Sequence, residues 1–179
     1  VDVQDYEFLD WKLQVNSAVS GDDFASHNAY VGRRAQVGQG AYIENSYVLG
    51  SSHIGEGTVL SHVRINDRHI PSDVVMHGME LLDGTHIVRI YGVQDNPKDK
   101  YQSGIGFLGT TLEEIMQNNG IEETDLWNDG ERYLWFACLY PVCTSHEEAL
   151  NAADVLYRMS HGTASADEIE IWKKSKRMS

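Results

Sequence analysis

The chain has few cations, few prolines and no long apolar segment, and these shortages exclude several classes of protein. Lysine and arginine number 14 against 27 aspartates and glutamates, which gives a formal net charge of −13 over 179 residues. Nucleic acids and anionic membranes are bound by cationic surfaces, so this balance argues against both as partners. The longest apolar run, residues 133–143, is eleven residues long and contains Pro141, which is too short to span a bilayer.

Cysteine is also scarce. The two cysteines, Cys138 and Cys143, both lie in this apolar run. A disulfide or half of a zinc site is one interpretation, but we expect two buried thiols in a reduced, cytoplasmic protein. The chain begins at Val1 without a methionine or a basic leader, so we expect no signal peptide and either a processed protein or an interior piece of a longer one.

A short internal repeat occupies the first third of the chain. Nine steps from Leu13 to Ile65 can be aligned, eight of six residues and one of five residues at Leu49–His53. Eight of the nine begin with a branched aliphatic residue, Ala25 being the exception, and glycine follows in four of them. In a hexapeptide repeat, each step forms one short strand and one corner, with the aliphatic side chain pointing inward. The pattern therefore predicts a β-solenoid of about three coils, and a meander of ordinary short strands is the alternative.

The pattern changes after Ile65. Two apolar segments flank Asp83-Gly84, which is a strong hairpin signal, and a polar loop containing Pro97 follows. We expect this hairpin to cap the open end of the coil, because a solenoid cannot bury its terminal coils alone.

The last seventy residues predict helices and one strand. Thr110 or Thr111 caps a helix that ends near Gly120, and capping boxes at Ser145–Glu148 and Ser165–Glu168 open two more. The aromatic and aliphatic segment 132–142 is predicted to be a strand. The predicted organisation is a β-helix over 1–65, a hairpin cap and loop over 66–100, and an α+β region over 101–179.

Several motifs are candidates for sites of chemistry. Gly104, Gly106 and Gly109 have dinucleotide-binding spacing, but a loop precedes them where that motif needs a strand, so we expect a turn into a capped helix. No phosphate-binding loop, nucleophile elbow or His-Glu-x-x-His pair occurs in the sequence.

The repeat contains three histidines that suit a zinc site by number. His27, His53 and His62 would suffice for a catalytic zinc, and two of them can share an edge of the coil, but we expect solvent-facing corner histidines. One of them acting as a general base would suit a hexapeptide acyltransferase, although those enzymes need a longer solenoid.

Two groups of basic residues stand out against the acidic background. Arg33-Arg34 falls on outward positions of the repeat, where it can bind a phosphorylated sugar or a partner domain or remain solvated. The segment Lys173–Arg177 holds four of the fourteen cations, and we expect it to stabilise the C-terminus of a helix.

Six segments together resemble one enzyme family in their order and spacing. They are Ile70–Gly78, Ile90–Asn96, Gly109–Glu114, Asp125–Trp127, Leu134–Val142 and Trp172–Ser179. Nearly the whole chain resembles the part of L-fucokinase and GDP-L-fucose pyrophosphorylase proteins that lies between the nucleotidyltransferase and the sugar kinase.

The resemblance implies a bifunctional salvage enzyme. Its kinase phosphorylates L-fucose with ATP, its nucleotidyltransferase joins fucose 1-phosphate to GTP, and Mg²⁺ assists both steps. It also implies a left-handed coil. The glycine-rich loops of both catalytic domains are missing here, so no catalytic, substrate-binding or metal-binding residue can be assigned to this chain.

We therefore expect a non-catalytic scaffold that needs no cofactor of its own. Its partners would be the flanking nucleotidyltransferase and sugar-kinase domains, with a homo-oligomer through exposed coil edges as a further expectation. Two alternatives stay open: a hexapeptide acyltransferase or zinc-dependent lyase, and a regulatory module that binds a sugar nucleotide. The acidic composition also predicts an anionic surface on the solenoid and its cap.

Overall fold

The computed structural model describes residues 24–101 and 104–179 of the chain, and the repeat steps predicted over 13–23 lie outside these ranges. The chain divides into two compact units, Val1–His77 and Gly78–Ser179. The division falls inside one strand, Val74–Glu80, whereas the sequence predicted boundaries after residues 65 and 100. Each unit is described by itself below.

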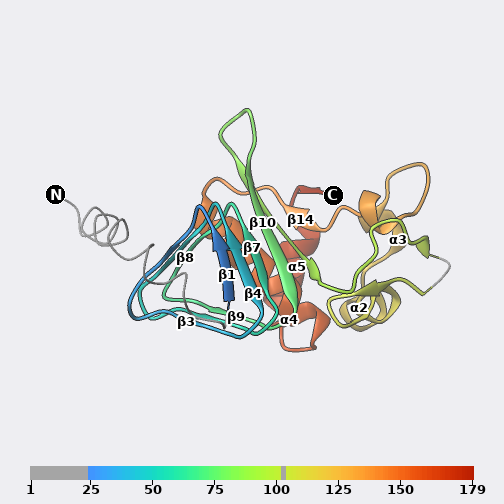
Figure 1. Ribbon diagram of the computed structural model, residues 1–179. Helices are drawn as coiled ribbons and strands as arrows, with labels where there is room; N and C mark the ends of the chain where they lie inside the picture. The colour runs from blue at the N-terminus through green and yellow to red at the C-terminus, as the bar shows by residue number, and fades with distance from the viewer. Residues whose placement is uncertain (1–23, 102–103) are drawn as a thin grey trace. The chain divides into compact units, whose positions relative to one another are not determined.

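Short parallel strands stacked in three ladders form the described part of the first unit (Figure 1). The ladders are β1-β4-β7-β10, β2-β5-β8 and β3-β6-β9. This arrangement confirms the predicted β-solenoid of about three coils. The strands are β1 (Phe24–His27), β2 (Tyr30–Val31), β3 (Gln36–Val37), β4 (Ala41–Glu44), β5 (Tyr47–Leu49), β6 (His53–Ile54), β7 (Val59–Ser61), β8 (Arg64–Asn66), β9 (His69–Ile70) and β10 (Val74–Glu80).

The coils stack in a regular register. Ser26 pairs with Ile43, and Ile43 pairs with Leu60, and the two residues of each pair are 17 positions apart in the sequence. The hydrogen-bonded residues Glu44 and Ser61 have the same separation. The next partners, Leu60 and Met76, are one residue closer in the sequence. The usual coil is thus one residue shorter than three hexapeptides, so a five-residue step recurs in successive coils.

The position of this short step differs from the prediction. Val48 pairs with Val31 and Ile65 and is fully buried, whereas the neighbouring Leu49 is only half-buried. The five-residue step is therefore Ile43–Tyr47, with Val48 beginning the next step, and the predicted step at Leu49–His53 was wrong. An aliphatic residue directly after the true core position shifted the alignment by one.

Two glycines are required by the close approach of successive coils. A Cβ atom on Gly38 would lie 2.5 Å from the Glu56 backbone nitrogen, and one on Gly55 would lie 2.3 Å from the nitrogen of Ser72. Any side chain here would push the next coil away. This explains why glycine follows the core aliphatic residue at these steps.

The register predicts different roles for two adjacent residues. Val48→Ala should lower the free energy of unfolding by about 2 kcal/mol, because it leaves a cavity in a closed core. Leu49→Ala should cost less than about 1 kcal/mol, because that side chain is partly in water already. Urea denaturation of both variants measures the difference. Equal losses would contradict this register.

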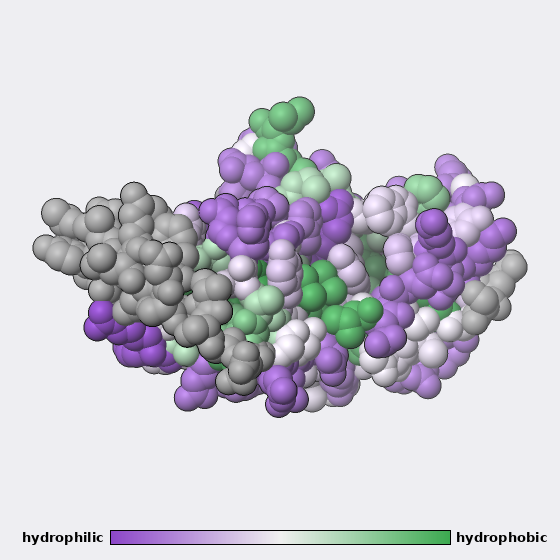
Figure 2. Space-filling model, in the orientation of Figure 1, coloured by the Kyte–Doolittle hydropathy of each residue, from purple (hydrophilic) through white to green (hydrophobic). Residues whose placement is uncertain are grey.

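A hairpin begins the second unit. β10 continues into a turn at Leu81–Thr85 and returns as β11 (His86–Gly92), with Gly84 at a positive φ of 82°. This confirms the hairpin predicted at Asp83-Gly84. Leu82 is fully exposed, and the hairpin tip is visibly apolar (Figure 2).

Three helices of the second unit begin at the predicted caps, and a fourth, with Glu122 as its N-cap, was not predicted. Thr111, Ser145 and Ser165 each accept a hydrogen bond from the backbone N–H three residues later. Gly120 ends the first of these helices in the left-handed conformation. The helices are α2 (Leu112–Asn119), α3 (Glu123–Leu126), α4 (His146–Ser160) and α5 (Ala166–Lys174). None of the helices in the described parts of the chain combines the length and apolar character that a membrane crossing needs.

The strand predicted over 132–142 is largely wrong. The segment forms a 3₁₀ turn, η2 (Leu134–Phe136), and only β14 (Tyr140–Pro141) is a strand, paired with β15 (Arg177–Met178). Trp135 and Phe136 are 66% and 52% exposed, so this apolar run does not enter the core as a unit. Backbone hydrogen bonds to Pro97 and Asp99 hold the turn instead.

Candidate functional site

A connected polar cluster lies on the ladder β1-β4-β7-β10. The strands lie side by side (Figure 1), and their register places His27, Glu44, Ser61 and His77 in one row across these four strands. On β4 the buried Ala41 and Ile43 alternate with the half-buried Tyr42 and Glu44, so the row lies on the face of the ladder opposite the core.

Glu44 is the centre of the cluster. Its Oε1 accepts a hydrogen bond from the Ser61 hydroxyl at 2.9 Å, and its Oε2 accepts one from the Tyr42 hydroxyl at 3.3 Å. Partial burial, the negative charge of Glu44 and this hydrogen bond raise the pKa of Tyr42. Both carboxylate oxygens are therefore engaged by the protein itself.

Ser61 connects the carboxylate to an imidazole. Its Oγ lies 2.9 Å from His62 Nδ1, and the His62 ring meets the His77 ring edge to face at 5.6 Å. A hydroxyl has one proton, and here Ser61 donates it to Glu44. With that proton on Glu44, Ser61 can only accept in its contact with His62 Nδ1, which requires the tautomer that carries a proton on Nδ1.

His62 also occupies a demanding backbone position. Asn28, Asn45 and His62 follow one another at one corner of successive coils, and all have positive φ angles, 49°, 45° and 54°. Asn28 Nδ2 donates to Asn45 Oδ1 along this corner. Asparagine and histidine tolerate this conformation better than most residues, so the corner explains why these types recur.

The three histidines considered for zinc do not come together. His27 and His62 belong to the region of the first ladder, while His53 lies on β6 in another, stacked on His69 at 4.7 Å. In residues 24–101 and 104–179, no group of three or more histidine, cysteine, aspartate or glutamate side chains is placed to hold a metal ion.

Other predicted sites have local structural explanations. Gly106 lies in a two-stranded hairpin, β12 (Gly106–Phe107) and β13 (Thr110–Thr111), that leads into α2. Cys138 and Cys143 are free thiols and only half-buried, and partial burial with the charge of Glu148 raises the pKa of Cys143. The Arg33-Arg34 pair is exposed in the turn between β2 and β3.

The basic C-terminal segment is structural, as predicted for its position. Arg177 donates to the carbonyl oxygens of Trp172 and Lys173 in the last turn of α5. It also donates to Cys138 and Asp125, and its guanidinium stacks on the Trp172 ring at 4.2 Å. Burial lowers the pKa of Arg177. The four carbonyl oxygens accept hydrogen bonds from its Nε, Nη1 and Nη2 atoms.

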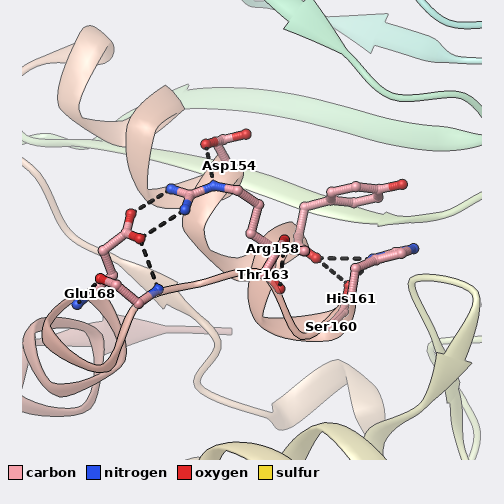
Figure 3. A network of polar contacts seen from close by, with 8 residues as sticks. Asp154, Arg158, Ser160, His161, Thr163 and Glu168 are labelled. Atoms are coloured by element: carbon pink, nitrogen blue, oxygen red, sulfur yellow. Dashed lines mark hydrogen bonds and ion pairs between the residues drawn. The ribbon is translucent and has the colours of Figure 1, made fainter.

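A second polar network joins α4 to α5 (Figure 3). Arg158 forms two parallel hydrogen bonds with Glu168, one of 2.8 Å, and a third with Asp154 at 2.9 Å. Glu168 also accepts from the Ser165 backbone N–H and so closes the capping box of α5. The hydrogen bonds from Arg158 and then Ser165 lower the pKa of Glu168 to about 2. Each partner has a structural role, so this network is a helix clamp.

The helix clamp predicts a defined pH dependence. The pKa of Glu168 is lower in the folded chain than the ordinary value of 4.5, so its stabilisation is complete above about pH 4.5 and disappears as the pH falls toward 2. Glu168→Gln should therefore cost about 1 kcal/mol at pH 7, and much less near pH 3. Urea denaturation at several pH values measures this.

A control exists on the same helix. Glu170 is 58% exposed and lies 3.8 Å from Lys173, so Glu170→Gln should change the stability little at any pH. A loss in Glu168→Gln that stays constant from pH 7 to pH 3 would rule out the ion pair as its origin.

Glu44, Ser61, His69 and His77 were not predicted from the sequence. These residues carry no known motif, and they become neighbours only through the register of the coils. The signal that would have found Glu44 and Ser61 is their equal spacing of 17 residues after His27, which the six-residue alignment hid.

Comparison with known proteins gives the context of the fold. Residues 7–145 match the family model described as the fucose pyrophosphorylase domain. The chain is 32% identical over 116 residues to the bifunctional fucokinase/GDP-fucose pyrophosphorylase of Arabidopsis thaliana. That match covers 63% of this chain but only 10% of the plant protein. No solved structure matches significantly.

Proposed function

The chain belongs to the fucose pyrophosphorylase domain family, and on this basis we propose that it is a non-catalytic scaffold segment of an L-fucose salvage enzyme. The proposed enzyme phosphorylates L-fucose with ATP and joins fucose 1-phosphate to GTP, forming GDP-L-fucose and releasing pyrophosphate. Nucleotidyltransferase and sugar-kinase domains would supply both reactions, with Mg²⁺, in the cytoplasm.

One observation carries the scaffold proposal: polar side chains of the coil bind the neighbouring coil. Ser61 donates to Glu44 one coil earlier, and Asn28 donates to Asn45 one coil later. The buried Ser46 accepts from the Val63 backbone N–H, which also lies one coil later. Side chains that look chemically capable in sequence are thus engaged in holding coils together.

The size of the relative supports the same proposal. The plant protein, whose name includes both activities, is about ten times longer than the matched part. A rigid coil followed by a helical unit suits a segment that holds larger domains in place. An oligomer contact through the coil edges is part of the proposal, because edge strands offer unpaired backbone groups.

Turnover assays test the proposal directly. The purified 179-residue chain should release no ADP from ATP with L-fucose, and no pyrophosphate from GTP with fucose 1-phosphate. The Arabidopsis bifunctional relative, assayed in the same buffer with Mg²⁺, is the positive control.

The alternatives predict different results. Turnover that disappears in Glu44→Gln or Ser61→Ala would replace the scaffold by an active site at this cluster. Acyl transfer from an acyl-CoA, or one tightly bound zinc per chain, would instead favour the acyltransferase or lyase class. Either outcome would overturn a purely structural role.

A further inference from the structure

Two exposed aromatic side chains follow one another on the turn η2. Trp135 and Phe136 are 66% and 52% exposed, whereas Leu134 before them and Ala137 after them are buried. Among the exposed large apolar side chains of the described residues, these two alone are neighbours in the sequence. Aromatic side chains are enriched at the centres of protein interfaces, so the pair indicates a contact surface.

The turn that carries the two rings is held firmly. The Trp135 backbone N–H donates to the Pro97 carbonyl oxygen at 2.9 Å. The Tyr133 carbonyl oxygen accepts from the buried Trp127 Nε1 at 2.9 Å and from the Phe136 N–H at 3.1 Å. A surface that is already ordered loses little conformational freedom when a partner binds, which favours binding.

Cations lie on aromatic rings at two places in this unit. Lys100 Nζ lies 5.3 Å from the centre of the Tyr133 ring, and that ring meets Phe136 edge to face at 6.1 Å. The Arg177 guanidinium stacks on Trp172 at 4.2 Å. The faces of aromatic rings attract cations, and indole does so most strongly. Trp135 offers an exposed ring of this kind.

The acidic residues of the chain are concentrated outside the described coil. Residues 24–77 contain four arginines and four acidic residues, so this part is neutral although the whole chain carries −13. The sequence-based expectation of an anionic solenoid surface is not met by this count. Residues 78–179 contain 17 acidic and nine basic residues, so the second unit carries a net charge of −8.

The segment around the exposed rings is strongly acidic. Residues 122–136 contain five acidic residues and one cation, Arg132, which is ion-paired with Glu123. Asp129 and Glu131 are exposed. Residues 97–101, which are hydrogen-bonded to this segment, add two lysines and one aspartate, so the two segments together carry −3.

One of these carboxylates is placed beside the aromatic residues by its electrostatic effect. The hydrogen bond and charge of Tyr133, and then the charge of Glu131, raise the pKa of Lys100. Because salt screens charges beyond about 8 Å, nearby groups such as Glu131 determine which ligand is attracted. An anionic ligand such as a nucleotide is therefore disfavoured at these rings, and a cationic one is favoured.

We propose that the surface formed by Trp135, Phe136, Asp129 and Glu131 binds an arginine-rich segment of a partner protein. A guanidinium group is planar and weakly hydrated, so it can stack on indole while its N–H groups pair with carboxylates. This surface goes beyond the scaffold role. It follows from the aromatic and acidic residues alone, so it does not depend on the proposed place of the chain in fucose salvage.

A short peptide of alternating glycine and arginine, blocked at both ends, is the probe for this surface. Titrated into the 179-residue chain at low ionic strength, it should bind saturably in calorimetry, and added salt should weaken the binding. A lysine peptide of the same length and charge should bind at least about threefold more weakly, because an ammonium group has no planar face to stack.

Substitutions of the exposed indole test the stacking. Trp135→Ala should weaken binding of the arginine peptide at least about tenfold, and Trp135→Phe should retain part of the affinity because a ring remains. Leu82→Ala is the matched control. Leu82 is also an exposed apolar side chain near acidic residues, Glu80 and Asp83, and its loss should leave the affinity unchanged.

A second pair of variants tests the charge. Glu131→Gln should weaken the binding of the arginine peptide and reduce its dependence on salt. Glu80→Gln is the control, because Glu80 is likewise exposed but lies at the end of β10, and it should change neither quantity.

The indole N–H signals in NMR spectra report on the site and on folding together. The Trp135 signal, assigned by its absence in Trp135→Phe, should move when the arginine peptide is added. The Trp172 signal should stay in place in every variant, because that buried indole donates to the Leu139 carbonyl oxygen at 3.1 Å.

Three results would overturn the proposal. Equal affinity for the lysine peptide, or equal weakening in Leu82→Ala or Glu80→Gln, would show general attraction of cations to an acidic chain. Saturable binding of GDP that disappears in Trp135→Ala would instead assign the ring to a nucleobase. Absence of saturation by the arginine peptide below about 1 mM would leave no docking surface of useful strength.

Discussion

Backbone hydrogen bonding between coils is the constraint on which the first unit depends. The Gly32 N–H donates to the Val48 carbonyl oxygen, and the Tyr47 N–H to that of Val63, so each coil must repeat the path of the one before it. A side chain between coils would break this contact, which excludes Cβ atoms at Gly38 and Gly55. The corners must turn within nearly the same length of chain, which requires left-handed residues at regular intervals.

Stacking also determines what polar residues can do. Residues at equivalent positions of successive coils become neighbours whatever their chemistry, so a row can contain complementary groups or like groups. Glu44 and Ser61 are complementary and satisfy one another, which ties two coils together. His53 and His69 are like groups, and their rings stack at 4.7 Å on paired strands. The same geometry thus produces both complementary and like pairs.

The sequence predicted correctly those features that depend on only a few neighbouring residues. The caps at Thr111 and Ser165 act within four residues, and the hairpin at Asp83-Gly84 depends on one turn, so both were predicted correctly. The coil was predicted as a fold but not in register, because choosing Val48 over Leu49 depends on partners in the neighbouring coils.

The same limit applies to the sites and to the apolar run. Glu44 and Ser61 meet only in the folded coil, and the stacked pair of His53 and His69 cannot be found from spacing in hexapeptides. Trp135 lies in a run that reads as a buried strand, yet backbone bonds to a distant loop turn it outward. The repeating coil also limits how such domains can change length. An insertion or deletion of a few residues within a strand would misalign every later row of stacked residues. We therefore expect relatives to gain or lose whole coils, or to vary in length at the corners.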